Sequence, residues 1–191
     1  MMRRMLLAAA VALGLGGAAL AATPEDTLVI EVAGGGTVEI GLRPDLAPQH
    51  VARIKELARA GAYDGVAFHR VIEGFMAQTG DVEYGTRAAF GGGNAGMGGS
   101  ALPDLPAEFS NESFQRGTVG MARSMDPNSA NSQFFIMFAP APHLDGQYTV
   151  VGEVVSGQDV VDGLERGEVA RGGAVAKPDW MEKVYIKSDK P

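Results

Sequence analysis

Residues 66–81 form the stretch that most constrains what this chain can fold into. Val66 to Ile72 is rich in β-branched and aromatic residues, which is typical of a β-strand. Gly74 interrupts this pattern, and a second short apolar run begins at Phe75. The stretch therefore predicts two consecutive short strands that are separated at Gly74.

Arg70 is charged and lies in the middle of the first of these strands. Because alternate residues of a strand share a face, Phe68, Arg70 and Ile72 are expected on one face and His69 and Val71 on the other. A guanidinium among large apolar groups is costly unless its charge is used. The residues alone leave two explanations open: the aliphatic stem packs on the sheet while the head reaches water, or the charge serves a functional site.

The chain is long enough for one domain with a substantial core, because it has 191 residues of which 46% are hydrophobic. It contains no cysteine, so disulfides, thiolate catalysis and thiolate metal ligands are excluded. We expect a single domain over residues 27–191, preceded by a short linker over residues 22–26.

The beginning of the chain has the pattern of an export signal. Arg3 and Arg4 give a positive start, Met5 to Leu20 carries no charge, and Ala19-Leu20-Ala21 offers small residues where a signal peptidase reads the chain. We therefore predict a cleaved signal peptide over residues 1–21 and a periplasmic location. The alternative is an uncleaved transmembrane anchor, but the apolar run is shorter than the roughly 20 residues that a span needs.

The charge of the chain argues against several classes of partner. The formal net charge is −7, and removal of residues 1–21 takes away two arginines and no acid, which leaves −9. Nucleic acid and anionic lipid are therefore not expected as main partners. No membrane attachment is expected after signal cleavage, since lipid attachment through cysteine is impossible. We expect a freely soluble monomer.

The rest of the sequence predicts many short strands and about two helices. The predicted strands cover residues 27–32, 37–42, 66–72, 75–78, 118–122, 132–139, 148–155 and 180–187. One helix is predicted from Pro48 to a stop at Gly61, with Val51, Ile54 and Leu57 on its apolar face and Arg53 elsewhere, and a weaker one over residues 159–166. Short strands with hairpin turns and few helices favour an antiparallel barrel or sandwich.

The segment from Glu83 to Pro106 holds seven glycines and two prolines and predicts a long surface loop. Residues 91–96 within it match the spacing G-x-G-x-x-G. We reject a dinucleotide site, because no hydrophobic strand leads directly into the match and no helix can continue into Pro103 and Pro106.

The usual catalytic motifs are missing, because the sequence contains neither H-E-x-x-H nor G-x-S-x-G. The three histidines, His50, His69 and His143, have no metal-ligand spacing, so no metal site and no cofactor is expected. His50 is expected to be solvated or to pack at the start of the helix. His69 is expected to be a buried, hydrogen-bonded core residue, and His143 lies in a turn.

Four blocks of sequence, taken in order, resemble the cyclophilin family of peptidyl-prolyl cis–trans isomerases. They are Phe68-His69-Arg70-Val71-Ile72 with Gly74-Phe75-Met76-Ala77-Gln78, then Gly120-Met121-Ala122-Arg123, then Asn131-Ser132-Gln133-Phe134-Phe135-Ile136, and then His143-Leu144-Asp145-Gly146. The resemblance extends from about Thr27 to the C-terminus. It implies a mainly β fold, a closed eight-stranded antiparallel barrel capped by two α-helices, with the site on the outside of the barrel.

The resemblance also implies roles for individual residues. It places the catalytic arginine at Arg70. It places the proline pocket at Phe75, Met76, Phe135 and Leu144, and the peptide-holding groups at Gln78, Ala122, Arg123 and Gln133. Three positions depart from the animal members: His143 stands where they have tryptophan, Tyr148 where they have histidine in the pocket rim, and Arg123 where they have asparagine. The resemblance leaves cyclosporin sensitivity open, because an indole donor and a large apolar surface are lost at His143.

The function implied is rotation of X-Pro peptide bonds in proline-containing polypeptides during the folding of exported proteins. A second hypothesis is a proline-segment binding module, or a holdase chaperone, with little turnover. A third is a dedicated partner of one envelope protein. Catalysis at protein concentrations far below that of the substrate separates the first from the second, because a binder only shifts populations.

Overall fold

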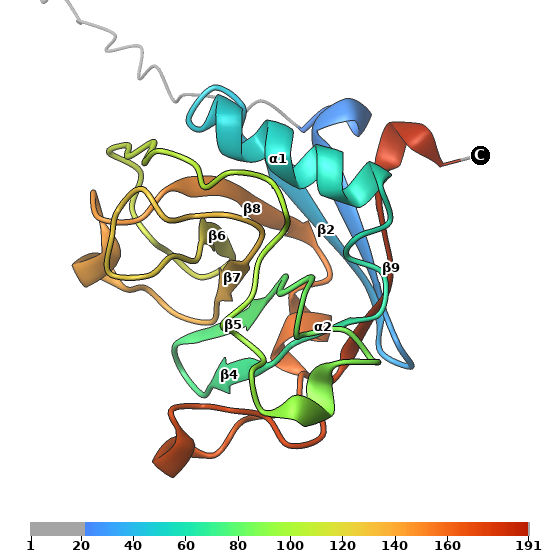
Figure 1. Cartoon of the computed structure of the whole chain (residues 1–191). Helices are drawn as coiled ribbons and strands as arrows, with labels where there is room; N and C mark the ends of the chain where they lie inside the picture. Colours follow the sequence, from blue (N-terminus) through green and yellow to red (C-terminus); the bar gives the residue numbers. More distant parts are fainter. Residues whose placement is uncertain (1–21, 191) are drawn as a thin grey trace, which may run out of the picture.

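A computed structural model describes residues 22–190 of the chain, and the predicted signal peptide lies outside the described residues. The fold is mainly β and consists of one antiparallel sheet with two α-helices, as predicted (Figure 1). Among residues 22–190, no helix combines the length and the apolar character needed to cross a membrane.

The sheet has nine strands in the order β3-β9-β1-β2-β8-β6-β7-β5-β4, and every neighbouring pair is antiparallel. The strands are β1 Thr27–Val32, β2 Gly36–Leu42, β3 Val66–Ala67, β4 Arg70–Ile72, β5 Met76–Thr79, β6 Thr118–Met121, β7 Phe134–Met137, β8 Val150–Ser156 and β9 Trp180–Ile186. The helices are α1 Pro48–Arg59 and α2 Gln158–Asp162, and the 3-10 helices are η1 Pro24–Asp26, η2 Phe90–Gly92, η3 Pro142–Leu144, η4 Val169–Arg171 and η5 Lys187–Asp189.

The two edge strands of this sheet, β3 and β4, are consecutive in the chain, so the chain itself links one edge of the sheet to the other. This differs in detail from the predicted closed barrel of eight strands, because the single strand predicted over residues 66–72 is split into two. β3 pairs with β9, whereas β4 pairs with β5. Phe68 and His69 lie between them and belong to neither strand.

The split changes which residues share a face, and the prediction for Phe68 is wrong. Phe68 is only 1% exposed and packs in the main core cluster together with Val71, not with Arg70 and Ile72. Ile72 packs instead against a second apolar cluster on the outer face of the sheet. The buried residues of this second cluster are Met76, Phe114, Phe135, Met137, Ala141, Leu144 and Val150. Strict alternation holds only while consecutive residues remain in one pleated strand, and residues 68–69 interrupt it.

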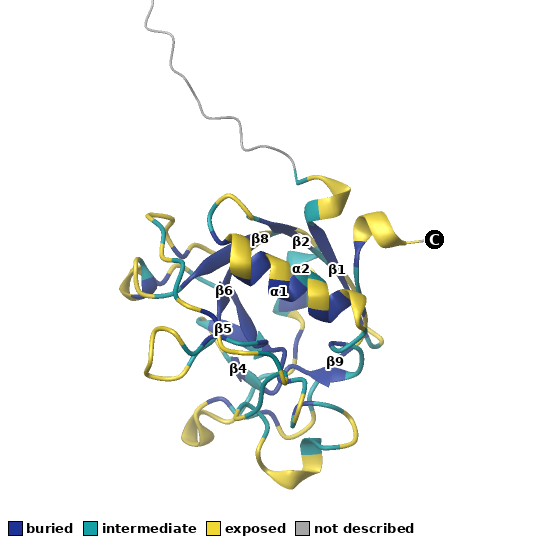
Figure 2. Cartoon of the chain, turned by 45° about the horizontal axis from the view of Figure 1, so that its top comes forward, coloured by how far each residue is buried: buried dark blue, intermediate teal, exposed yellow. Residues whose placement is uncertain are grey.

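Helix α1 covers the main core with one face, and Figure 2 shows the buried side of the helix turned toward the sheet and the exposed side turned outward. The predicted apolar stripe of Val51, Ile54 and Leu57 is buried. Arg53 is also buried, at 7% exposure, which the sequence did not predict. Its guanidinium donates to the backbone carbonyl of Pro103 at 2.8 Å, so its charge ties the helix to the glycine-rich segment.

A carboxylate from a distant part of the chain caps the start of α1. Ala47 occupies the cap position and offers no side-chain hydrogen bond. Glu108 instead accepts hydrogen bonds from the backbone N–H groups of Gln49 and His50 and lies 2.6 Å from Nδ1 of His50. His50 is therefore a fully buried packing residue, which was one of the two roles predicted for it. The other helix, α2, ends at Asp162 before Gly163 and is shorter than predicted.

The strands β4, β5 and β7 carry apolar side chains on both faces. On the inner face, Val71, Ala77 and Ile136 are aligned across the three strands and join the main core. On the outer face, Met76 and Met137 join the second apolar cluster. The functional site is built over this second cluster.

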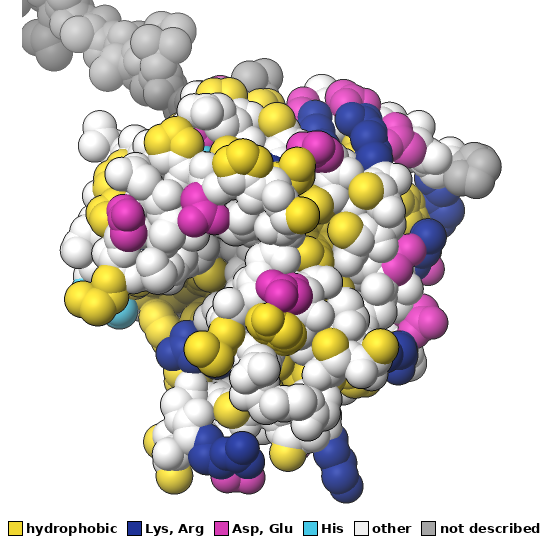
Figure 3. All heavy atoms as spheres, in the orientation of Figure 1, with side chains coloured by type: hydrophobic (Ala, Val, Ile, Leu, Met, Phe, Trp, Pro, Cys, Tyr) yellow, Lys and Arg dark blue, Asp and Glu magenta, His cyan; other side chains and the backbone are white. Residues whose placement is uncertain are grey.

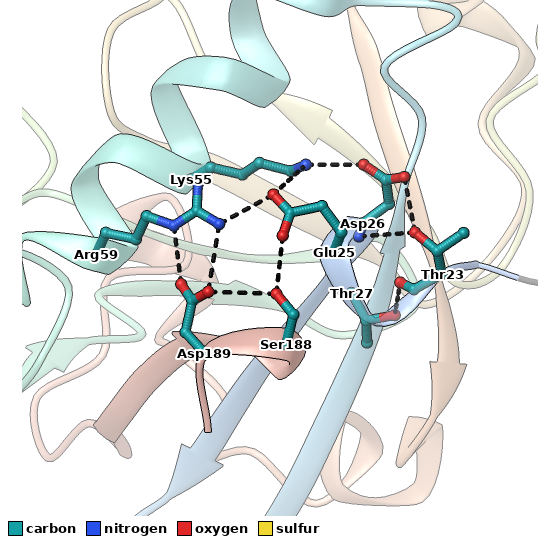
Figure 4. Close-up of polar contacts among 8 residues, drawn as sticks. All are labelled: Thr23, Glu25, Asp26, Thr27, Lys55, Arg59, Ser188 and Asp189. Carbon is teal, nitrogen blue, oxygen red and sulfur yellow. Dashed lines mark hydrogen bonds and ion pairs between the residues drawn. The ribbon is translucent and has the colours of Figure 1, made fainter. Parts of the chain in front are cut away.

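Residues 22–26, predicted as a linker, contain η1 and are tied to the domain by a group of charged side chains (Figure 4). Lys55 of α1 donates to Asp26 at 2.8 Å. Arg59 donates to Glu25 at 2.9 Å and to Asp189 of η5 at 2.8 Å. Both ends of the described chain are thus held against the same end of α1.

These contacts predict how stability depends on pH. Hydrogen bonds from Arg59 and Ser188 lower the pKa of Glu25 from 4.5 to about 2, and the bond from Arg59 also lowers the pKa of Asp189. A carboxylate whose pKa is depressed by folding stabilises the fold above its unfolded pKa and loses that contribution as the pH falls through its folded pKa. The contribution from Glu25 is therefore lost between about pH 4.5 and pH 2.

We expect Arg59→Gln to lower the free energy of unfolding at neutral pH and to flatten its decline over this acidic range. Denaturant unfolding of both proteins across the range measures the difference. High salt should reduce it, because the groups are exposed and screened. Parallel pH curves for the two proteins would contradict the assignment.

Candidate active site

The strand register brings three predicted site residues into one row on the outer face of the sheet. Arg70 of β4 is the cross-strand partner of Gln78 in β5, and Gln78 is the partner of Phe135 in β7. Directly opposed residues of neighbouring antiparallel strands point to the same face with their Cβ atoms about 5 Å apart. The outer face is also where the resemblance placed the site.

The guanidinium of Arg70 is held by two hydrogen bonds on different nitrogens. Nε donates to the backbone carbonyl of Gly172 at 2.9 Å, and Nη1 donates to Oε1 of Gln78 at 3.2 Å. Within residues 22–190, Nη2 has no hydrogen-bond partner. The side chain is half-buried, and this burial lowers the pKa of Arg70, an effect that Tyr148 partly opposes. Arginine stays charged at any ordinary pH, so one free, charged donor remains at the surface of the site.

The apolar part of the site is the second cluster, which gathers six of the predicted residues. These are Phe75, Met76, Ala122, Phe135, Leu144 and Tyr148. A seventh predicted residue, His143, lies beside the cluster. Phe75 and His143 stack with ring centroids 5.8 Å apart, and Tyr148 meets Phe135 edge-on, also at 5.8 Å. Met76 is buried beneath the surface, with its sulfur 4.0 Å from Nη1 of Arg70.

Phe114 supports this cluster and was missed by sequence reasoning. It is fully buried, and its ring stacks against Phe135 with centroids 5.7 Å apart. It lies in a segment without strand or helix periodicity, so nothing in the local pattern indicates its position. Gly120 leaves the room for this stack, because a Cβ there would lie 2.5 Å from the Phe135 ring.

Four of the predicted residues, one of them shared with the cluster, line a neighbouring cavity of about 520 Å3. They are Gln78, Ala122, Arg123 and Gln133, and residues 96–100 also line the cavity. Figure 3 shows the molecule hollowed on the side of β5 and β7, with a hydrophobic floor and a basic side chain at the lower rim. The site therefore combines an apolar cluster, a neighbouring polar cavity and a fixed cation.

The glycine-rich segment is an ordered wall of the site and not a free loop. Gln133 receives a hydrogen bond from Gln78 at 2.9 Å and donates to the carbonyls of Gly96 and Gly98 at 3.1 and 2.8 Å. Asp81 accepts from the N–H groups of the same two glycines. Sequence reasoning missed the part played by Asp81. The signal available was an acidic residue at the end of β5 followed by closely spaced glycines.

Arg123 lies at the cavity, but its side chain is engaged by the chain itself. Its Nη2 donates to the carbonyl of Gln147 at 2.8 Å, its Nη1 to that of Ser124 at 2.9 Å, and its guanidinium lies 4.2 Å from the centre of the Tyr148 ring. Within the described part of the chain, the backbone N–H and C=O of Arg123 have no hydrogen-bond partner. The main chain at this position, and not the side chain, is thus open to a peptide.

His69 is buried as predicted, but the predicted hydrogen bonds are absent: neither ring nitrogen has a partner among the described residues. Burial lowers its pKa, which favours the neutral ring. The ring packs instead against Gly96, where a Cβ would lie 3.1 Å from it. In the described part of the chain, no three His, Asp or Glu side chains come together in a way that could hold a metal ion.

An antiparallel sheet that carries an apolar cluster and the fixed guanidinium of Arg70 on its outer face agrees with the arrangement that the resemblance to the cyclophilins implied. The family described as cyclophilin type peptidyl-prolyl cis-trans isomerase/CLD matches residues 27–187. The chain belongs to this family.

Relatives cover most of the chain. A probable peptidyl-prolyl cis-trans isomerase of Brucella suis is 60% identical over 191 residues, which covers 98% of this chain and 97% of the relative. The peptidyl-prolyl cis-trans isomerase CYP23 of Arabidopsis thaliana is 39% identical over 153 residues, covering 80% of this chain and 66% of the relative. These relatives place the chain among the peptidyl-prolyl cis–trans isomerases.

Solved structures agree on the fold. The cyclophilin AquaCyp293 from Hirschia baltica superposes with a TM-score of 0.74 at 28% identity, covering 89% of this chain and 77% of that one. A Cryptosporidium parvum cyclophilin, crystallised in the presence of the dipeptide Ala-Pro, superposes with a TM-score of 0.71 at 22% identity over 84% of this chain and 98% of that one. At this identity the second comparison shows the fold alone.

The contacts of Arg123 predict that its planar fork matters more than its charge. We expect Arg123→Ala to lower the free energy of unfolding by about 1 kcal/mol, because a cation–π contact and hydrogen bonds are lost. It should raise KM for a proline peptide by up to about tenfold, which corresponds to ~1.4 kcal/mol, with less effect on kcat. Arg123→Lys should resemble Arg123→Ala, since an ammonium cannot reproduce the fork. Line-shape NMR separates the two constants, and full retention of KM in the lysine variant would contradict this role.

Proposed function

We propose that this protein accelerates cis–trans rotation of X-Pro bonds in polypeptides that fold after export, with Arg70 as its catalytic residue. The observation that carries the proposal is the guanidinium of Arg70, fixed at Nε and Nη1 beside the second apolar cluster and left with a free donor at Nη2. Membership of the cyclophilin family supports the reaction type.

The chemistry requires little more than a well-placed donor. Rotation about a peptide bond faces a barrier of about 18–20 kcal/mol because resonance stiffens the C–N bond. In the twisted state the prolyl nitrogen becomes pyramidal and regains a lone pair. A donor aimed at this lone pair stabilises the twisted state more than either planar isomer, which is the condition for catalysis. No bond is made or broken, so the proposed reaction involves no nucleophile.

The two parts of the site have different tasks in this proposal. The apolar cluster around Phe75, Phe135 and Leu144 holds the proline ring. Gln78 and the free backbone groups of Arg123 hold the residues that precede it. With the two sides of the bond held separately, one can turn against the other, and the donor is already in place when the peptide binds.

The export part of the proposal rests on the sequence of residues 1–21. A positive start, an uncharged apolar run and a small-residue cleavage pattern together direct a protein to the export machinery. A mature chain with formal charge −9 would then act as a soluble monomer on proline-containing chains. Mass spectrometry of the periplasmic fraction tests this: an N-terminus at Ala22 supports it, whereas an intact N-terminus in the cytoplasm contradicts it.

A holdase with little turnover is a second candidate, and one observation favours it. Met97 and Met125 are 79% and 96% exposed, and both belong to segments that line or adjoin the cavity. Flexible methionine side chains suit contact with varied apolar segments. An assay with the protein far below the substrate concentration distinguishes the two, because only a catalyst then speeds the approach to equilibrium.

We expect Arg70→Ala to fold normally and to lose about 100-fold or more in kcat/KM, the usual cost of removing one preorganised donor. A proline-peptide assay measures the loss, and circular dichroism checks the fold. Arg59→Ala is a suitable control, because that arginine pairs with Glu25 and Asp189 at the end of α1. Unchanged turnover in the Arg70 variant would remove this residue from the mechanism.

A further inference from the structure

Residues 167–174, which precede β9, form a turn that is hydrogen-bonded along the edge of β4 beside Arg70. The N–H of Val71 donates to the carbonyl of Gly173 at 2.8 Å, and the carbonyl of Val71 accepts from the N–H of Gly167 at 2.9 Å. Arg70 itself forms an antiparallel bridge with Ala174. The turn, which contains η4, thus continues the pairing of the sheet beyond β4.

Two glycines allow the turn to lie this close. A Cβ on Gly167 would lie 1.8 Å from the carbonyl oxygen of Gly173, and a Cβ on Gly173 would lie 2.4 Å from Cγ1 of Ile72. Gly172 is different, because a Cβ there would meet no atom within 4 Å. Its φ is +66°, in the left-handed region that favours glycine. A side chain at Gly172 would therefore disturb the backbone conformation, although there is space for it.

This conformation delivers one carbonyl to the guanidinium. The carbonyl of Gly172 accepts from Nε of Arg70 at 2.9 Å, while Gln78 accepts from Nη1. An arginine side chain has several rotatable bonds, and a single hydrogen bond leaves its plane free to swing. Two bonds on different nitrogens fix the plane and therefore the direction of the remaining donor.

We propose that Gly172 is a positioning residue for Arg70, whose left-handed backbone holds Nε so that Nη2 is oriented before a peptide binds. The inference deepens the proposed function and rests on it. Displacement of a reacting group by about 1 Å can cost about 100-fold in rate. The turn is otherwise peripheral: Val169 within it is 89% exposed, and none of η4 is buried. Loss of the carbonyl should therefore affect turnover more than stability.

The chain offers a matched set of variants. Gly172→Val removes the left-handed conformation, because β-branched residues rarely adopt positive φ. Gly172→Asn is the conservative variant, since asparagine tolerates this region best after glycine. Gly34 is the control: its φ is +70°, a Cβ there also meets no atom within 4 Å, and it lies in the turn between β1 and β2, far from η4 in Figure 1. Gly34→Val therefore imposes the same local strain away from the site.

We expect Gly172→Val to lower kcat by about tenfold or more while the affinity for a proline peptide, measured by titration, changes little. Gly172→Asn should recover most of the lost turnover. Gly34→Val should lose a similar amount of stability and keep its turnover. Gly172→Ala introduces less backbone strain and should show a smaller loss of kcat. It replaces the valine variant if that protein does not fold.

A second measurement is independent of activity. The 15N Nε–H resonance of Arg70, identified by its disappearance in Arg70→Lys, should move or broaden in Gly172→Val without substrate present. It should stay in place in Gly34→Val.

Unchanged turnover in a folded Gly172→Val protein, an unmoved resonance, or an equal loss of turnover in Gly34→Val would each overturn the inference. A wild-type protein without turnover would instead count against the proposed function, since the resonance comparison still reports whether Gly172 holds Arg70.

Discussion

The structure depends on apolar side chains that strands β4, β5 and β7 present on both of their faces. Burial of apolar side chains is the main stabilising term in folding, and here it acts on each side of one sheet. The inner residues, such as Val71 and Ile136, fill the main core, while their neighbours Met76 and Met137 form a second cluster outside it. That outer cluster gives a rigid, apolar floor on the surface of the molecule. A site built on paired strands is held more firmly than one built on loops.

On this floor the polar groups form one connected chain of hydrogen bonds. The carbonyl of Gly172 holds Nε of Arg70, Gln78 accepts from Nη1 and donates to Gln133, and Gln133 donates to the glycine-rich wall at Gly96 and Gly98. Half-buried polar groups are costly when unpaired. Within this network, among the described residues, each side-chain nitrogen and oxygen but one has a partner. The exception is the second terminal nitrogen of Arg70, which is the group that the proposed reaction uses.

Glycine appears in the site for three separate physical reasons. Gly120 makes room for the stacking of Phe114 on Phe135. Gly98 lets the backbone lie close to the Asp81 carboxylate, because a Cβ on Gly98 would be 2.5 Å from Oδ1 of Asp81. Gly172 adopts a left-handed conformation. Each fixes the position of a neighbouring group. The chain has 27 glycines. Several of them are required because backbone and side chains lie close together around the site, so they do not indicate flexibility.

The sequence by itself determined the fold class, the short strands, helix α1 and, through four ordered blocks, the family and the candidate residues. These features are local, because the periodicity of a strand or a helix depends on residues that are close together in the sequence. The tertiary structure decided the rest. It set the split of residues 66–72 that moves Phe68 into the core, the cap that Glu108 provides for α1, the contacts of the Arg123 side chain with Gln147 and Tyr148, and the carbonyl of Gly172 on Arg70. Each of these joins residues that are far apart in the sequence, or depends on where strand pairing stops. A local pattern of hydrophobicity carries no information about such contacts.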